Sequence, residues 1–96
     1  MAAAVTEVVA LEGELDFGTA FDAEMRLEDA MRRAERLVID LRPLTFIDST
    51  GLGVIVEANQ RARREGVTLE ILPGPRPVQQ VFEVSGLIDA LPFTER

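Results

Sequence analysis

The stretch LTFIDSTGLG, residues 44–53, connects a predicted strand to a predicted helix. This stretch lies between a short apolar segment, Leu37–Leu41, and a long helical pattern that runs to Glu65. Ser49 is thereby placed at the carboxyl end of a strand, where open α/β sheets usually present their functional residues. It also lies at a helix start, whose unpaired N–H groups favour an anionic oxygen or phosphate. A modifiable hydroxyl is one interpretation of Ser49, and an ordinary helix-start serine is the other.

The composition indicates one globular domain covering residues 1–96. Ninety-six residues are enough for one modest core, and 47% hydrophobic with 28% charged residues is typical of globular proteins. No apolar run approaches the roughly 20 residues needed to cross a bilayer, so no direct membrane contact is expected. The chain has no cysteine, and a reducing cytoplasm is therefore the expected location.

The net charge of the chain argues against a nucleic-acid partner and favours a basic protein partner. A net charge of −7 argues against nucleic-acid binding, because contact with a phosphate backbone needs a positive protein surface. An acidic domain is instead suited to a basic protein partner, whose approach the charge would steer.

Hydrophobic periodicity and turn residues predict alternating strands and helices. Thr19 is expected to cap the first helix with Asp22 in a capping box, and Asp48 or Ser49 to cap the second. The first strand is followed by a loop over residues 12–18. The predicted strands are 5–11, 37–41, 67–72 and 91–94, and the predicted helices are 20–35, 50–65 and 77–84.

This order predicts an α/β fold with parallel strands joined by crossover helices. Each strand carries polar residues at alternate positions, among them Glu7, Asp40 and Glu70. A parallel sheet covered on both faces would instead show continuous apolar runs. The fold class expected is therefore a mostly parallel four-stranded sheet with helices on one face.

Most catalytic chemistry is excluded by residues that the chain lacks. A serine hydrolase centred on Ser49 needs a histidine or lysine base, and the sequence contains neither. The glycines around Ser49 lack the lysine and the spacing of a phosphate-binding loop. Asp16, Asp40 and Asp48 show no close metal-ligand spacing, so no metal and no cofactor are expected. These absences argue against an enzyme.

A phosphate on Ser49 would act mainly on the surface. It would add about −1.5 to −2 charge at neutral pH, which the dipole at a helix N-terminus tolerates. Asp48 beside it, and any acidic or apolar partner surface, would tolerate that charge less well. The expected effect is a broken interface without an unfolded domain.

Three ordered blocks resemble the STAS domain family, and specifically the bacterial anti-sigma factor antagonists. The central block joins Ile39-Asp40-Leu41 to residues 46–55, FIDSTGLGVI. An earlier block is Gly13-Glu14-Leu15-Asp16 with Thr19-Ala20, and the closing block is residues 82–87, FEVSGL. Together they span roughly residues 5–93.

The resemblance implies a small βα superhelix with helices to one side, and it implies a mechanism. In that family, the serine after the aspartate is phosphorylated by the anti-sigma factor, which is also an ATP-dependent serine kinase. The unphosphorylated antagonist binds this partner and frees the sigma factor, and a metal-dependent serine phosphatase resets it. Carried over, Ser49 is the phosphate acceptor and Thr50 the secondary candidate. Asp16, Asp48 and Gly51 would lie on the partner surface.

Other members of the family leave alternatives open. STAS domains also occur in anion transporters, as subunits of lipid-transport ATPases, and as scaffold subunits of a stress-sensing complex. Family members usually have a further strand before residue 5 and a helix after the last strand. Without that strand, an unpaired sheet edge favours a homodimer or strand exchange. The sigma pathway, the cognate kinase, the oligomeric state and whether the chain is a fragment stay open at this stage.

Overall fold

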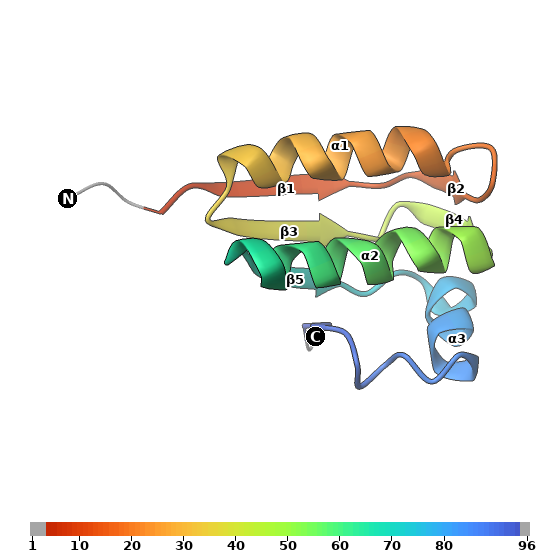
Figure 1. Cartoon of the computed structure of the whole chain (residues 1–96). Helices are drawn as coiled ribbons and strands as arrows, with labels where there is room; N and C mark the ends of the chain where they lie inside the picture. Colours follow the sequence, from red (N-terminus) through yellow and green to blue (C-terminus); the bar gives the residue numbers. More distant parts are fainter. Residues whose placement is uncertain (1–3, 95–96) are drawn as a thin grey trace.

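The computed structural model describes residues 4–94, which form alternating strands and helices (Figure 1). Residues 1–3 and 95–96 of the predicted domain lie outside the described residues. Between residues 4 and 94, no helix is both long enough and apolar enough to cross a membrane. The elements in chain order are β1 (Thr6–Ala10), β2 (Gly13–Leu15), α1 (Ala20–Arg33), β3 (Arg36–Asp40), β4 (Leu44–Ile47), α2 (Ser49–Glu65), β5 (Thr68–Leu72) and α3 (Arg76–Val84).

Three parallel strands form the main sheet, in the order β1–β3–β5. Val9, Ile39 and Ile71 are neighbours in register and are buried on one face, whereas Val8 on the other face is 61% exposed. Figure 1 shows α1 running along β1 and α2 running along β3 and β5, while α3 lies near β4 at the carboxyl ends of the strands. The predicted α/β class, with parallel strands and the long helices on one face, is confirmed.

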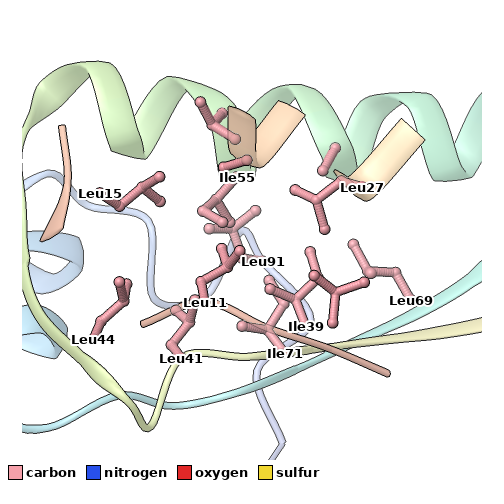
Figure 2. Packing of buried hydrophobic residues seen from close by; sticks show 14 of the residues in the cluster. Leu11, Leu15, Leu27, Ile39, Leu41, Leu44, Ile55, Leu69, Ile71 and Leu91 are labelled. Atoms are coloured by element: carbon pink, nitrogen blue, oxygen red, sulfur yellow. The ribbon is translucent and has the colours of Figure 1, made fainter. Parts of the chain in front are cut away.

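The core fills the space between that face and the two long helices. Figure 2 shows Leu27 of α1 and Ile55 of α2 pointing toward Ile39 and Ile71 of the sheet. All four side chains are at most 2% exposed. The buried residues of α1 recur at helical spacing on its inner face, and they are Ala20, Ala23, Leu27, Ala30 and Met31.

A second, two-stranded parallel ladder joins β2 to β4. The sequence predicts a loop over residues 12–18, and this prediction is wrong for Gly13–Leu15. A strand of three residues is too short to show alternation, and Gly13, with φ of +74°, reads as a turn residue. The ladder places Leu15 opposite Ile47, directly before α2.

The predicted fourth strand of the main sheet, residues 91–94, is also wrong. Only one parallel bridge forms there, between Phe93 and Ile71. Pro92 has no N–H to donate to a ladder, although its carbonyl accepts a hydrogen bond from Ile71 N–H at 3.0 Å. The Phe93 N–H turns back to the Leu91 carbonyl at 2.8 Å. The predicted four-stranded sheet is therefore three strands with a separate pair.

The turn after β3 is held by an ion pair between Asp40 and Arg42. Asp40 is the only charged residue among residues 4–94 that is buried, with 8% of its surface exposed. Its two carboxylate oxygens accept hydrogen bonds from Arg42 Nε at 2.9 Å and from an Arg42 terminal nitrogen at 3.0 Å. These bonds from Arg42 lower the pKa of Asp40, outweighing the opposing effect of burial.

We expect the Asp40–Arg42 pair to make stability depend on pH in one direction. The pKa of Asp40 is lowered from 3.8 in the folded state, so its stabilising contribution is present above pH 3.8 and is lost as pH falls through the lower folded value. Asp40→Asn should reduce the free energy of unfolding by about 1.5–3 kcal/mol at pH 7, the usual range for hydrogen bonds to charged groups. The gap between wild type and variant should close on acidification below pH 3.8, as measured by urea denaturation.

The matched control is Asp29→Asn, which removes the exposed ion pair of Asp29 with Arg33. Solvent and salt screen that pair, so Asp29→Asn should lower the free energy of unfolding at pH 7 by less than Asp40→Asn does. If the difference in free energy of unfolding between wild type and Asp40→Asn widened on acidification, this would contradict a lowered pKa of Asp40 in the folded state.

Candidate functional site

Ser49 is the first residue of α2 and follows the end of β4 by two positions. Asp48, with extended backbone angles, is the N-cap residue, and its carboxylate accepts a hydrogen bond from Gly51 N–H at 2.9 Å. Of the two caps considered from the sequence, the structure therefore selects Asp48. The Asp48 cap leaves the Ser49 side chain unused by the helix start.

The Ser49 hydroxyl faces solvent. Ser49 is exposed and Thr50 is partly buried. Within the part of the chain that the structure describes, neither hydroxyl makes a hydrogen bond to another residue. Figure 1 shows the start of α2 at the end of the molecule where β2, β4 and the start of α1 also lie. Ser49 is thus accessible to another protein at the carboxyl end of the strands.

The ladder between β2 and β4 brings Asp16 to the same place. Leu15 lies opposite Ile47, and the Asp48 N–H extends the pairing with a hydrogen bond to the Leu15 carbonyl at 3.2 Å. Asp16 and Asp48, each one residue further along, therefore flank the start of α2. The structure therefore brings together Asp16 and Asp48, the two acidic residues that the family resemblance places on a partner surface.

The loop that carries Asp16 is held by hydrogen bonds, and these correct the predicted capping box. The Asp16 carboxylate accepts bonds from Gly18 N–H at 3.0 Å and Thr19 N–H at 3.2 Å. The Thr19 hydroxyl donates to the Glu14 carbonyl at 2.8 Å and makes no cap hydrogen bond to α1. Because this hydroxyl is engaged outside the helix, the expected pairing of Thr19 with Asp22 does not form.

Gly51 lies beneath this surface and is buried. A Cβ atom on Gly51 would meet the Leu15 carbonyl oxygen at 2.3 Å and the Ile47 side chain at 2.8 Å. Both contacts are shorter than real Cβ atoms make, and the first is to backbone. Gly51 therefore allows the first turn of α2 to pack directly on the β2–β4 ladder.

The site lacks the features of a metal or small-molecule centre. Among residues 4–94, no three acidic side chains are grouped so that they could hold a metal ion. A cleft of about 420 Å³ lies between α1 and residues 10–15, and Arg26 reaches across it to the Ala10 carbonyl at 3.0 Å. Ser49 does not line this cleft, so the chemistry of the exposed serine is that of an accessible surface group.

Two exposed phenylalanines near this site were missed from the sequence. Phe17 is 85% exposed and Phe21 is 74% exposed. Phe21 and Met25 are four residues apart on α1, and Phe17 precedes them by the same spacing in the turn before the helix. This spacing could have been recognised as a second apolar stripe.

Comparison with known families identifies the fold. The STAS domain model matches residues 4–96, so the chain belongs to the STAS domain family. An anti-sigma F factor antagonist from Paenibacillus polymyxa is 33% identical over 88 residues, which cover 90% of this chain and 75% of the relative. A protein from Bordetella bronchiseptica that is named "Putative anti-sigma factor antagonist BtrV" is 32% identical over 89 residues, covering 88% of this chain and 74% of the relative. The resemblance stated from the sequence is confirmed.

Solved structures agree in fold. An anti-sigma factor antagonist from Mycobacterium paratuberculosis has a TM-score of 0.81 at 24% identity, covering 93% of this chain and 76% of that one. The antagonist SpoIIAA in its unphosphorylated form has a TM-score of 0.77 at 22% identity, covering 100% and 85%. A sulfate transporter family protein from Wolinella succinogenes has a TM-score of 0.78 at 20% identity, covering 92% and 75%. At these identities the likeness shows the fold alone.

The close approach at Gly51 predicts opposite effects for two alanine substitutions in α2. Gly51→Ala should lower the free energy of unfolding by about 1–3 kcal/mol, because the Leu15 backbone cannot move aside cheaply. Gly53→Ala should raise it by about 0.5–1 kcal/mol, because nothing lies within 4 Å and alanine favours the helix. Urea denaturation followed by circular dichroism measures both changes. Equal stability of the two variants would show that β2 does not constrain the first turn of α2.

Proposed function

We propose that this chain is an anti-sigma factor antagonist controlled by phosphorylation of Ser49. The unphosphorylated form binds an anti-sigma factor that is also an ATP-dependent serine kinase, and thereby releases the sigma factor. Phosphorylation of Ser49 ends this binding. The observation that carries the proposal is the exposed Ser49 hydroxyl, beside the Asp48 cap, in a STAS domain 33% identical to an anti-sigma F factor antagonist.

The proposed reaction is a phosphoryl transfer in which this chain is the substrate. The Ser49 oxygen attacks the γ-phosphorus of ATP, the bond to the β-phosphate oxygen breaks, and ADP leaves. The hydroxyl proton passes to a base supplied by the kinase. Thr50, which is partly buried, is the secondary acceptor. Ser85, at the end of α3, is given no switching role.

The local structure supports a change of surface without a change of fold. The Asp48 carboxylate is already bound to Gly51 N–H, and the Ser49 side chain takes no part in capping. A phosphate on Ser49 would lie near the positive end of the α2 dipole, which stabilises it locally. Its charge would add to that of Asp48 and Asp16 on the surface offered to the partner. Binding would therefore be weakened if the part of the partner that faces Ser49 is acidic or apolar, by repulsion in the first case and by desolvation of the phosphate in the second.

The proposed surface consists of Asp16, Asp48, Ser49 and Thr50, with Gly51 shaping it from beneath. The chain itself is proposed to be non-catalytic, since kinase and phosphatase activity both belong to its partners. A metal-dependent serine phosphatase would restore the binding form. The kinase needs ATP, and both partners would meet the chain in the cytoplasm. The alternative of a transporter domain is supported only by the structural likeness to a sulfate transporter family protein, and that likeness shows the fold alone.

The proposal predicts a single phosphate at one position. The chain is incubated with ATP and each of a panel of purified anti-sigma factor serine kinases from the source organism, and intact mass is measured. Wild type should gain one phosphate with its cognate kinase, and Ser49→Ala should gain none. Ser85→Ala is the matched control, because Ser85 is exposed and is the other serine of the chain. It should be phosphorylated like wild type.

The consequence for binding is tested with Ser49→Glu. This variant should bind the same kinase at least about tenfold more weakly, a change of about 1.4 kcal/mol, with an unchanged circular dichroism spectrum. Persistent phosphorylation of Ser49→Ala would place the acceptor elsewhere. Unchanged binding by Ser49→Glu would remove the switch from the proposal.

A further inference from the structure

Three large apolar side chains are exposed in a row beside the Ser49 site. Phe17 is 85% exposed, Phe21 is 74% exposed and Met25 is 43% exposed. Phe21 and Met25, four residues apart, lie on one outer flank of α1, away from its buried face, and Phe17 lies in the turn that precedes the helix. We call Phe17, Phe21 and Met25 the α1 stripe. Single exposed apolar residues are ordinary, but a contiguous group marks an interaction surface.

The turn before α1 fixes the first member of this stripe. The Ala20 N–H donates to the Asp16 carbonyl at 2.8 Å, so Phe17 lies within the hydrogen-bonded turn that precedes α1. The Thr19 hydroxyl also accepts a hydrogen bond from Asp16 N–H at 2.9 Å. Phe17 is therefore held in solvent by a hydrogen-bonded turn. Presentation by a rigid turn lowers the entropy cost of binding.

The α1 stripe is continuous with the surface around Ser49. Phe17 directly follows Asp16, which the β2–β4 ladder places next to Asp48. Figure 1 shows the start of α1 and the start of α2 at the same end of the molecule. A partner that reaches Ser49 can thus cover the stripe in the same encounter.

Carboxylates border the stripe. On a helical projection, Asp22 lies on one side of Phe21 and Glu24 on the other. Within residues 4–94 neither has an ion-pair partner, whereas Glu28 further along α1 is paired with Arg61 at 3.0 Å. Unpaired carboxylates around an apolar centre are complementary to a partner surface with an apolar socket and a basic rim.

We propose that the α1 stripe is a principal affinity contact for the anti-sigma factor kinase that phosphorylates Ser49. The inference rests on the proposed function and extends it from the acceptor serine to the outer flank of α1. The partner offers an apolar socket for Phe21, bordered by arginine or lysine. A second copy of this chain fits less well, because it would bring the same carboxylates and another net charge of −7 against the stripe.

The test measures binding and phosphorylation for Phe21→Ala and Met25→Ala, using the kinase of the panel that phosphorylates Ser49. Both positions are exposed, so the fold should be kept, which circular dichroism checks. Phe21→Ala should raise Kd and KM about tenfold or more, with a smaller rise for Met25→Ala and little change in kcat for either. Val84→Ala is the matched control, because Val84 is 83% exposed on α3 outside the stripe, and it should leave Kd unchanged.

The charge of the rim is tested separately. The double variant Asp22→Asn, Glu24→Gln should weaken binding and flatten its dependence on salt, since it removes the attraction to a basic rim. The control Glu83→Gln, Asp89→Asn removes two exposed carboxylates elsewhere on the chain and should leave that dependence nearly unchanged.

The outcomes separate the inference from the function on which it rests. If wild type is phosphorylated at Ser49 and Phe21→Ala leaves Kd and KM unchanged, the stripe is not a contact for the kinase. The proposed function then still holds. Failure of every kinase to phosphorylate Ser49 overturns both. Concentration-dependent self-association of wild type that Phe21→Ala abolishes, seen by analytical ultracentrifugation, would assign the stripe to a second copy and overturn the kinase assignment.

Discussion

The position of Ser49 depends on the contact between the first turn of α2 and the backbone of Leu15. The Leu15 carbonyl accepts the Asp48 N–H at 3.2 Å, and the absence of a Cβ at Gly51 lets α2 approach the same oxygen. Asp48 then closes the turn through Gly51 N–H. One strand of three residues thus fixes the end of β4, the start of α2 and the loop that carries Asp16.

This arrangement separates the fold from the surface chemistry. The residues that hold the turn together, Leu15, Asp48 and Gly51, act through backbone groups and one carboxylate. Ser49 is exposed beside them and stabilises nothing through its side chain. A group added to its oxygen therefore changes charge without removing a structural contact. A surface that is remodelled by charge alone suits reversible control, because the domain need not refold at each cycle.

Much of the fold, and less of the site's geometry, followed from sequence patterns. Strands over residues 37–41 and 67–72 and the helix after Asp48 were predictable, since their periodicity extends over several residues. The β2–β4 ladder was not, because pairing of such short segments is decided by tertiary contacts rather than by alternation. Pro92 limited the fourth strand to one bridge. The Thr19 hydroxyl donates its hydrogen bond to the Glu14 carbonyl and does not cap the start of α1. Local patterns do not reveal which of two available partners a polar group selects.

If the α1 stripe contacts the kinase, it supplies affinity for the complex, whereas phosphorylation of Ser49 switches the complex off. A single phosphate can change binding by only a few kcal/mol, each 1.4 kcal/mol being a factor of about ten in Kd. It can switch a complex fully only where the remaining contacts give an affinity near the working concentration of the partner. Three apolar side chains bordered by carboxylates can supply such an intermediate affinity without a large interface. The exposed Phe17 and Phe21 are therefore what a switch based on a single phosphate requires from the rest of its surface.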